Sequence, residues 1–285
     1  GYLFKSISTP EHMEWFVEES NGYGLMIKVK KKLYEHKGLQ YIEIYETEFG
    51  KMLVLDGRIQ LIEKFESSYH EMLVHVPMLT HPKPRKVLII GGGDGGTARE
   101  VLKHEPDEIV MVEIDRNVVD ACRKFIGVDK GALKDPHLTL LIEDGIEYVR
   151  SCKEKFDVLI VDGTDPSPAS KSLFSEEFYS ACARISDICS MQSQSPILQK
   201  REFQLILANT SPFAKRRVYV SYIPMYPGGM WSFLLAGDNL DAGIDEIKKR
   251  FEEREIETEY YTPLLHLAAF TLPKWLEKIV NEYIK

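Results

Sequence analysis

The chain has 285 residues, of which 44% are hydrophobic and 28% are charged, and its formal net charge is −8. This composition is typical of a globular domain, or of a large domain joined to a small one. The acidic balance argues against nucleic acid or an anionic membrane as the main partner and is compatible with a cationic small molecule. No apolar run reaches the ~18 residues that a membrane helix needs.

The four cysteines show no C-x-x-C pairing, and a chain of this length does not need disulfides for stability. They are Cys122, Cys152, Cys182 and Cys189. The first residues lack the continuous apolar core and the cleavage site of a signal peptide. We therefore expect reduced thiols and a cytoplasmic location.

The first part of the chain, residues 13–65, alternates apolar and polar residues between turn signals. Asp56-Gly57, between two such runs, is a strong hairpin signal, so a small antiparallel sheet is predicted. Residues 66–80 have the pattern of a helix, and the proline-rich stretch 81–86 is a connector. The sequence thus predicts an N-terminal β domain over residues 1–80 and a second domain over residues 81–285.

The second domain alternates strand and helix patterns. Near-continuous apolar runs separated by amphipathic helices indicate a mainly parallel sheet covered on both faces, which is a doubly wound α/β fold. The predicted strands are residues 86–91, 108–115, 138–144, 157–163, 190–195, 217–223 and 231–237, and a terminal helix is predicted within 272–285.

A glycine loop, Gly91-x-Gly93-x-x-Gly96, follows the first of these strands and precedes a helix, as in Rossmann-type nucleotide sites. Glu113 ends the next strand about twenty residues later, where a carboxylate can accept both ribose hydroxyls. Asp144 ends the following strand, where it can accept a hydrogen bond from an adenine amino group. Together these residues predict an adenosine site.

Asp94 lies within the glycine loop itself. The pyrophosphate of a dinucleotide would lie over this loop, and a carboxylate there would repel it. A sulfonium nucleoside has no phosphate and is positively charged, and decarboxylated S-adenosylmethionine carries only cations. Asp94 therefore favours that compound over a dinucleotide.

Asp162 and Asp165 follow the buried strand at 157–163. In an open parallel sheet, ligands bind beyond the carboxyl ends of the strands, so both should face the crevice that holds Asp94. Residues 166–170 could close over it. The alternative is an Asx turn with two solvated acids.

Taken together, these motifs resemble the polyamine aminopropyltransferases, the spermidine synthase family. The resemblance also includes "YHE" at 69–71 and "YIPMYPGGMWSF" at 222–233, and it runs from Trp15 nearly to the C-terminus. It implies a methyltransferase-type Rossmann-like fold, with an N-terminal domain that oligomerises and supplies part of the pocket. It also implies transfer of an aminopropyl group from decarboxylated S-adenosylmethionine to an amine, with putrescine expected as acceptor. A homodimer or homotetramer is the expected assembly.

The resemblance also assigns residue roles. On the donor side, it implies that Asp94 holds the amine of the aminopropyl group, that Glu113 binds ribose, and that Asp144 with Gly145 binds adenine. The remaining donor-side residues are Gln40, His70, Gly91, Gly93 and Gly96. On the acceptor side, it implies that Asp162 is the catalytic base and Asp165 holds the acceptor amine, in a pocket with Tyr69, Gln192 and Tyr226.

The chain departs from the family pattern at three points. Gly163 replaces the usual serine after the base, Gln194 stands where a glutamate is common, and Phe65 stands where an acid is common. The segment before Gln192 is also compressed. We expect changed flexibility of the loop after Asp162, without loss of the chemistry, and an altered distal end of the acceptor pocket. Agmatine and cadaverine are therefore alternative acceptors.

The chemistry predicts no cofactor and no metal, because a sulfonium is already a good leaving group. His70 and His75 have the spacing H-E-x-x-x-H, not the H-E-x-x-H of zinc proteases. Two other functions remain as alternatives. A methyltransferase would explain Glu113 and Asp144 but not Asp162 with Asp165, and a non-catalytic polyamine-binding protein would need no base.

Overall fold

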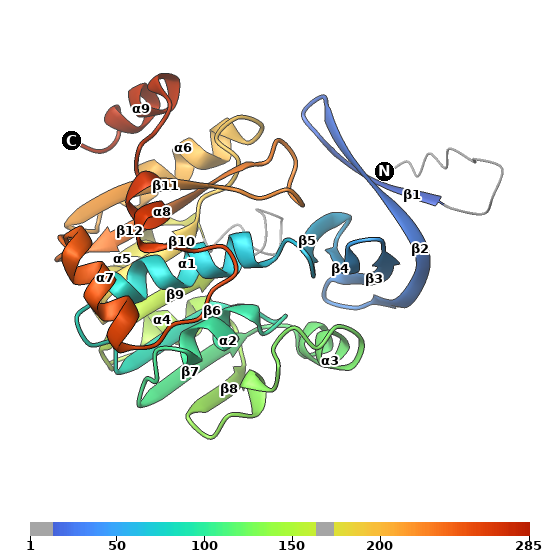
Figure 1. Ribbon diagram of the computed structural model, residues 1–285, viewed down its shortest axis with the longest axis horizontal. Coiled ribbons are helices and arrows are strands. Elements are labelled where there is room, and N and C mark those ends of the chain that lie inside the picture. Colours follow the sequence, from blue (N-terminus) through green and yellow to red (C-terminus); the bar gives the residue numbers. More distant parts are fainter. Residues whose placement is uncertain (1–13, 164–173) are drawn as a thin grey trace.

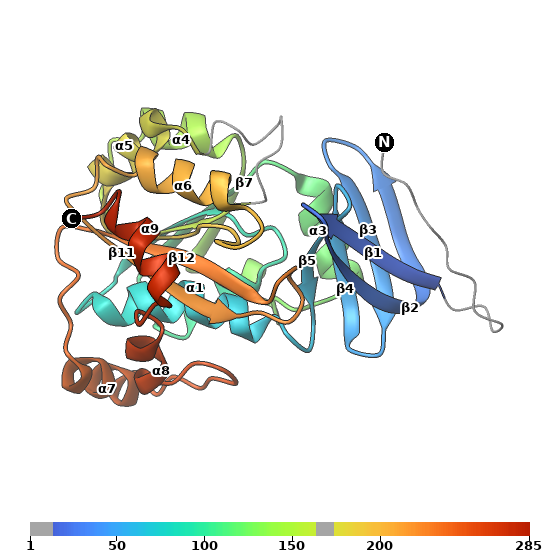
Figure 2. The same cartoon turned by 90° about the horizontal axis from the view of Figure 1, so that it is seen from above.

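The computed structural model describes residues 14–163 and 174–285, which form two sheets (Figures 1 and 2). The smaller sheet has five antiparallel strands in sequence order. They are β1 Glu14–Ser20, β2 Tyr23–Lys37, β3 Tyr41–Thr47, β4 Gly50–Leu55 and β5 Arg58–Ile62. Asp56 and Gly57 join β4 to β5 with positive φ values of 50° and 77°, as a tight hairpin turn requires. The predicted antiparallel sheet and its Asp-Gly hairpin are confirmed.

The larger sheet has seven strands in the order β11-β12-β10-β9-β6-β7-β8. Its strands are β6 Lys86–Gly91, β7 Glu108–Glu113, β8 Leu138–Ile142, β9 Phe156–Asp162, β10 Ser186–Gln192, β11 Lys215–Tyr222 and β12 Met230–Gly237. Strands β8, β7, β6, β9 and β10 run parallel, whereas β12 is antiparallel to both β10 and β11. The α/β class with a mainly parallel sheet is therefore confirmed.

One strand begins earlier than predicted. The sequence predicts a strand at 190–195, but β10 spans Ser186–Gln192. Ile188 and Cys189 are buried and pair with β9. The strand therefore already includes Ser186 and Asp187, although both are polar. The strand ends early because the chain turns after Gln192, and Gln194 has a φ of 74°.

Helices cover both faces of the larger sheet (Figure 2). They are α1 Ser67–Thr80, α2 Gly96–Leu102, α3 Arg116–Phe125, α4 Gly145–Ser151, α5 Glu176–Ile185, α6 Lys200–Asn209, α7 Ile244–Glu253, α8 Pro263–Ala268 and α9 Lys274–Asn281. Because side chains alternate along a strand, Val87 and Ile89 of β6 join the core under α1 and α7, whereas Leu88 and Ile90 join the core under α5 and α6. This two-sided burial explains the near-continuous apolar strands.

Helix α1 packs on the larger sheet, although the sequence analysis placed it in the N-terminal domain. Ser190 donates a hydrogen bond to the carbonyl of Leu73, and Tyr219 donates one to the carbonyl of Met72. On the other side of α1, the buried carboxylate of Glu71 accepts three backbone N–H bonds of 2.7 Å from residues 259–261. The helix is thus fixed on both sides, while the domain boundary after residue 80 stays a prediction.

The smaller sheet packs against α3 through a separate apolar cluster. Ile42, Ile44 and Leu53 of the sheet contact Val118 and Cys122 of the helix. This contact places the small sheet beyond the carboxyl ends of the parallel strands, on the side where ligands bind in such folds (Figure 2). Within residues 14–163 and 174–285, no helix is long and apolar enough to cross a membrane.

Candidate active site

A pocket lies between the two sheets, at the carboxyl ends of β6, β7, β9 and β10. It brings together most of the side chains that the sequence analysis selected. The selected residues that line it are Gln40, Tyr69, Gly93, Asp94, Glu113, Asp162, Gln192 and Tyr226. Asp165 lies outside the described residues. Residues from seven segments of the chain therefore converge on one site.

The glycines of the loop after β6 are required by close contacts. Gly91 has a φ of 86°, and a Cβ there would lie 2.1 Å from the carbonyl oxygen of Asp162. A Cβ on Gly93 would lie 2.9 Å from Oε2 of Glu113. A Cβ on Gly96 would lie 2.3 Å from the ring of His70. Side chains at these positions would displace the neighbours of the pocket, so glycine is the residue that fits.

Asp94 is held by its own loop and by a histidine. The backbone N–H of Gly96 donates to Oδ1 of Asp94 at 2.7 Å, and Nε2 of His70 lies 3.2 Å from the same oxygen. Burial opposes ionisation of Asp94, but the nearby cationic His70 and the hydrogen bonds lower the pKa of Asp94 below its usual value. The aspartate is therefore ionised and offers a negative charge to the pocket.

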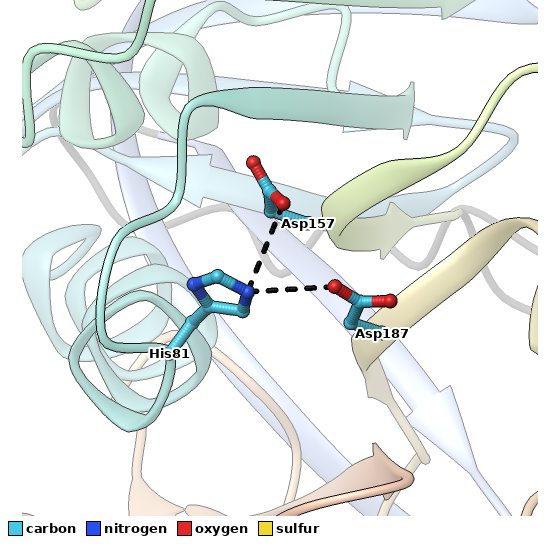
Figure 3. Close-up of side chains that lie close together, drawn as sticks. All are labelled: His81, Asp157 and Asp187. Carbon is cyan, nitrogen blue, oxygen red and sulfur yellow. Dashed lines mark ion pairs between the residues drawn. The ribbon is translucent and has the colours of Figure 1, made fainter.

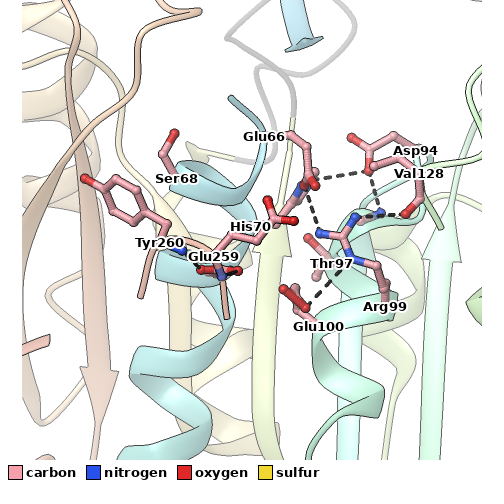
Figure 4. Close-up of polar contacts among 12 residues, drawn as sticks. Glu66, Ser68, His70, Asp94, Thr97, Arg99, Glu100, Val128, Glu259 and Tyr260 are labelled. Atoms are coloured by element: carbon pink, nitrogen blue, oxygen red, sulfur yellow. Dashed lines mark hydrogen bonds and ion pairs between the residues drawn. The ribbon is translucent and has the colours of Figure 1, made fainter. Parts of the chain in front are cut away.

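His70 lies behind Asp94 and under Gly96, and it is fully buried. Its Nδ1 hydrogen-bonds with Glu66, which also accepts a 2.9 Å bond from Arg99 (Figure 4). Burial alone would lower the pKa of His70, but the charges of Asp94 and Glu66 raise it well above the usual range. His70 is thus a cation between two carboxylates. Its predicted contact with the nucleoside stays a prediction.

Sequence reasoning missed Glu66. It noted that Phe65 replaces an acid and did not consider the next residue. Burial tends to raise the pKa of Glu66, but His70 and Arg99 together lower it to about 2. The signal was present in the sequence, because Glu66 and His70 are four residues apart and face each other on one side of α1.

Asp162 is anchored through both oxygens. Tyr69 donates to Oδ1 at 2.7 Å, and Thr97 donates to Oδ2 at 2.7 Å. Burial and then the charge of Asp94 raise the pKa of Asp162 above its usual value. A carboxylate with a raised pKa is better able to take a proton from a bound ligand.

Glu113 is buried at the end of β7, and its Oε1 accepts the N–H of Asp115 at 3.0 Å. Burial raises the pKa of Glu113 to about 7, and the charge of Asp115 adds to the effect. Asp144, in contrast, is exposed and caps α4 by accepting the N–H of Ile146 at 2.9 Å. A Cβ on Gly145 would lie 2.6 Å from Ile90, so the turn there is tightly packed. The adenine-binding role of Asp144 stays a prediction.

An aromatic wall leads away from Asp162. The ring centroids of Tyr69 and Tyr226 are 5.6 Å apart, and those of Tyr226 and Trp231 are 4.6 Å apart. The side chain of Gln192 is fixed at this wall, because Nε1 of Trp231 donates to it at 3.1 Å and Gln192 itself donates to the carbonyl of Gly163 at 3.3 Å. Such a wall suits a methylene chain.

Three further residues with polar side-chain atoms line the pocket and were not selected from the sequence. They are Glu18, Gln60 and Trp231. Glu18 accepts the N–H of Ile59 at 2.8 Å and lies 3.6 Å from Arg58, so the small sheet adds a fourth carboxylate to the pocket, beside Asp94, Glu113 and Asp162. The sequence of the first strand does not indicate that Glu18 lines a pocket. Glu18 becomes a pocket residue only because the two sheets pack together.

A cluster of His81, Asp157 and Asp187 lies at the opposite, amino-terminal end of the strands (Figure 3). Nε2 of His81 is 3.8 Å from Asp157 and 3.6 Å from Asp187. Nδ1 of His81 accepts the N–H of Lys83 at 3.0 Å, so the ring hydrogen is on Nε2 and points to the carboxylates. A metal-binding histidine usually faces the ion with its unprotonated nitrogen and donates the hydrogen of the other nitrogen to a carboxylate, a carbonyl or water. His81 has the opposite arrangement, so no ion is needed to explain this cluster.

Comparison with known proteins agrees with this geometry. The family model for the spermidine synthase tetramerisation domain matches residues 14–63, and that for the spermine/spermidine synthase domain matches residues 66–246. The polyamine aminopropyltransferase of Archaeoglobus fulgidus is 53% identical over 273 residues, which cover 95% of this chain and 100% of the relative. The protein of the same name from Caldicellulosiruptor bescii is 40% identical over 278 residues, which cover 94% of this chain and 98% of the relative.

Solved structures give the same result. A spermidine synthase in complex with the transition-state analogue AdoDATO has a TM-score of 0.91 and 37% identity, covering 98% of this chain and 99% of that chain. The spermidine synthase of Thermotoga maritima has a TM-score of 0.90 and 37% identity, covering 98% of both chains. The resemblance noted in the sequence is confirmed, and the chain belongs to the spermine/spermidine synthase family of transferases.

Proposed function

We propose that this chain transfers the aminopropyl group of decarboxylated S-adenosylmethionine to putrescine, giving spermidine and methylthioadenosine. The observation that carries the proposal is the pairing of Asp94 and Asp162 in one pocket, with a separate environment for each carboxylate. Family membership supports the reaction class. The donor and the acceptor are inferred from the chemistry of the pocket.

The charge of the pocket supports the donor. Asp94 is ionised, and none of the described residues that line the pocket is a lysine or an arginine. A substrate carboxylate or phosphate would therefore lack a cationic partner on these residues and would face Asp94. The ammonium and sulfonium of decarboxylated S-adenosylmethionine fit this surface, with the ribose hydroxyls at Glu113.

The aromatic wall and its carboxylates support a diamine acceptor. One amine would lie at Asp162, the methylene chain would lie along Tyr69, Tyr226 and Trp231, and the far end would reach the region of Glu18. Agmatine and cadaverine share this pattern of a cationic end and a methylene chain. They remain the alternative acceptors.

The main obstacle to the reaction is the protonated acceptor. An alkylamine has a pKa of about 10.4, so roughly one molecule in several thousand is neutral at pH 7, which corresponds to about 4–5 kcal/mol. Asp162 takes a proton from the acceptor ammonium. The neutral nitrogen then forms a bond to the aminopropyl carbon while the carbon–sulfur bond breaks, and methylthioadenosine leaves with the electron pair. This route requires no metal and no cofactor.

Product identification tests the proposal. The protein is incubated with decarboxylated S-adenosylmethionine and equal amounts of putrescine, cadaverine, agmatine and spermidine, and the products are identified by mass. Aminopropylated putrescine should dominate. A dominant product from another amine would replace the acceptor, whereas methyl transfer from S-adenosylmethionine, or tight binding of methylthioadenosine without turnover of any amine, would replace the reaction.

We also propose that the chain assembles into a homodimer or homotetramer through the small sheet. Residues 14–63 match the family's tetramerisation domain, and Tyr23, Met26 and Leu39 are exposed apolar side chains in this region. Mass measurement of the native protein in solution should give two or four chains. A monomer at micromolar concentration would contradict this assembly.

A further inference from the structure

Two consecutive residues in the first turn of α2 each donate a hydrogen bond to a different pocket carboxylate. The backbone N–H of Gly96 donates to Oδ1 of Asp94, and the hydroxyl of Thr97 donates to Oδ2 of Asp162, both at 2.7 Å. Thr97 is fully buried. The same helical turn therefore touches the donor side and the acceptor side of the pocket.

We propose that Thr97 is a positioning residue that fixes the orientation of the Asp162 carboxylate toward the acceptor amine. This inference rests on the proposed function. The Asp162 carboxylate is held from two helices, because Tyr69 of α1 binds one oxygen and Thr97 of α2 binds the other. With both oxygens held, the carboxylate cannot rotate about its χ2 bond without losing a hydrogen bond.

The direction of the Thr97 hydroxyl is informative. A threonine in a helix can donate to a backbone carbonyl three or four residues earlier in the same helix. Thr80 shows this behaviour, because its hydroxyl donates to the carbonyl of Val76 at 2.7 Å. Thr97 is the second residue of α2, so no carbonyl of its own helix lies three or four residues before it, and its hydroxyl donates into the pocket. Its single hydroxyl hydrogen is therefore used on Asp162.

Orientation matters because proton transfer requires a lone pair aimed at the ammonium while the nitrogen is aligned with the aminopropyl carbon. Without Thr97, only Tyr69 would restrain the carboxylate. The fraction of bound complexes with a correctly aimed base would fall. Binding of either substrate would change little, because Thr97 donates its hydrogen bond to Asp162.

The charge environment of Asp162 sets a second, separable effect. The groups that face it are Asp94 from the glycine loop, Glu113 from β7, and His70 and Tyr69 from α1. The Thr97 hydrogen bond stabilises the ionised form of Asp162 against the two carboxylates. Loss of this bond raises the pKa of Asp162 and moves the acid limb of the rate profile to higher pH. Above that limb, only an orientation effect remains.

The test uses two variants in the full chain. Thr97→Val keeps the branched shape and removes the hydroxyl, whereas Thr97→Ser keeps the hydroxyl and removes a methyl group. Thr80→Val is the matched control, because it also removes a buried helical hydroxyl. We measure kcat and KM for both substrates across pH, the affinity for methylthioadenosine, and the melting temperature.

Thr97→Val should lower kcat on the high-pH plateau roughly tenfold, with both KM values and the methylthioadenosine affinity within about twofold of wild type. Thr97→Ser should recover most of the loss, and Thr80→Val should keep the wild-type kcat. A wild-type plateau in Thr97→Val, or an equal loss in Thr97→Ser, would overturn the inference. If Thr97→Val unfolds, Thr97→Ala against Thr97→Ser gives the same comparison. Absence of turnover in the wild type would instead refute the proposed function.

Discussion

Nε2 of His70 lies 3.2 Å from Oδ1 of Asp94, so the carboxylate of the glycine loop has a buried cation behind it and the pocket in front of it. This arrangement keeps Asp94 ionised in a largely buried place, because the charge of His70 offsets the cost of burial. A carboxylate supported in this way can bind a substrate ammonium.

Asp94→Asn should therefore weaken binding of the aminopropyl ammonium and leave binding of the nucleoside part of the donor largely unchanged. An asparagine oxygen can still accept the Gly96 N–H, but it offers no charge to the aminopropyl ammonium. The KM for decarboxylated S-adenosylmethionine should rise about 10- to 100-fold, since a hydrogen bond to a charged group contributes about 1.5–3 kcal/mol. Methylthioadenosine has no ammonium, so its affinity, measured by calorimetry, should change less than about threefold. An equal loss for both ligands would contradict the assignment.

Glu66→Gln should reduce stability in a pH-dependent way. The pKa of Glu66 is lowered to about 2 from its usual 4.5, so its stabilisation is present above pH 4.5 and is lost as the pH falls through about 2. Denaturant unfolding at pH 6 should show a loss of about 3 kcal/mol. This difference from wild type should shrink between pH 4.5 and pH 2.

The surface pair of Lys30 and Glu48 provides the control for this experiment. Glu48→Gln should change stability little at any pH, because exposed ion pairs contribute little. A Glu66→Gln difference that stays constant between pH 6 and pH 2 would show that packing, and not charge, is the cause.

Glu113 should make nucleoside binding depend on pH near neutrality. Its pKa is raised to about 7 by burial, so the free protein holds a partly protonated Glu113 at pH 7. Ribose hydroxyls favour the ionised carboxylate, and binding should release a fraction of a proton. The affinity for methylthioadenosine should fall up to about tenfold from pH 8 to pH 6. Calorimetry in buffers of different ionisation enthalpy measures the released proton, and Glu113→Gln should abolish it.

Gly91→Ala should displace the base as well as strain the backbone. Gly91 and Gly131 both have a φ of 86°, but a Cβ on Gly131 meets no atom within 4 Å, whereas one on Gly91 would lie 2.1 Å from the Asp162 carbonyl. Both variants should lose about 1–2 kcal/mol from the left-handed conformation. Gly91→Ala should lose roughly 1–3 kcal/mol more and most of its activity. Equal stability of the two variants would contradict the close contact.

The sequence was sufficient to predict the convergence of Asp94, Glu113 and Asp162, because each ends or follows a strand of one parallel sheet and such ends meet at one edge. The placement of Gln192 and Tyr226 in the pocket was predicted only from the family resemblance. The sequence also predicted the hairpin at Asp56-Gly57, where local turn chemistry decides the structure.

Other features depend on contacts between distant segments, which no local pattern contains. Glu18 joins the pocket because the small sheet packs over α3, and Thr97 reaches Asp162 because β6 and β9 are neighbours. The predicted start of β10 was too late because Ser186 and Asp187 are polar, although both belong to the strand. Helix α1 follows the small sheet in sequence but packs on the large one, which a continuous chain pattern does not reveal.

In the proposed reaction Asp162 removes a proton from the acceptor amine, and the pH dependence of Asp162→Asn tests this step most directly. At pH 7 the variant should be at least about 100-fold slower than wild type, because almost all of the amine is protonated. The defect should shrink by pH 10, where a large fraction of the amine is neutral without a base. Unchanged methylthioadenosine affinity shows that the site is intact. A defect that is equally large at pH 7 and pH 10, or no defect at pH 7, would contradict the account.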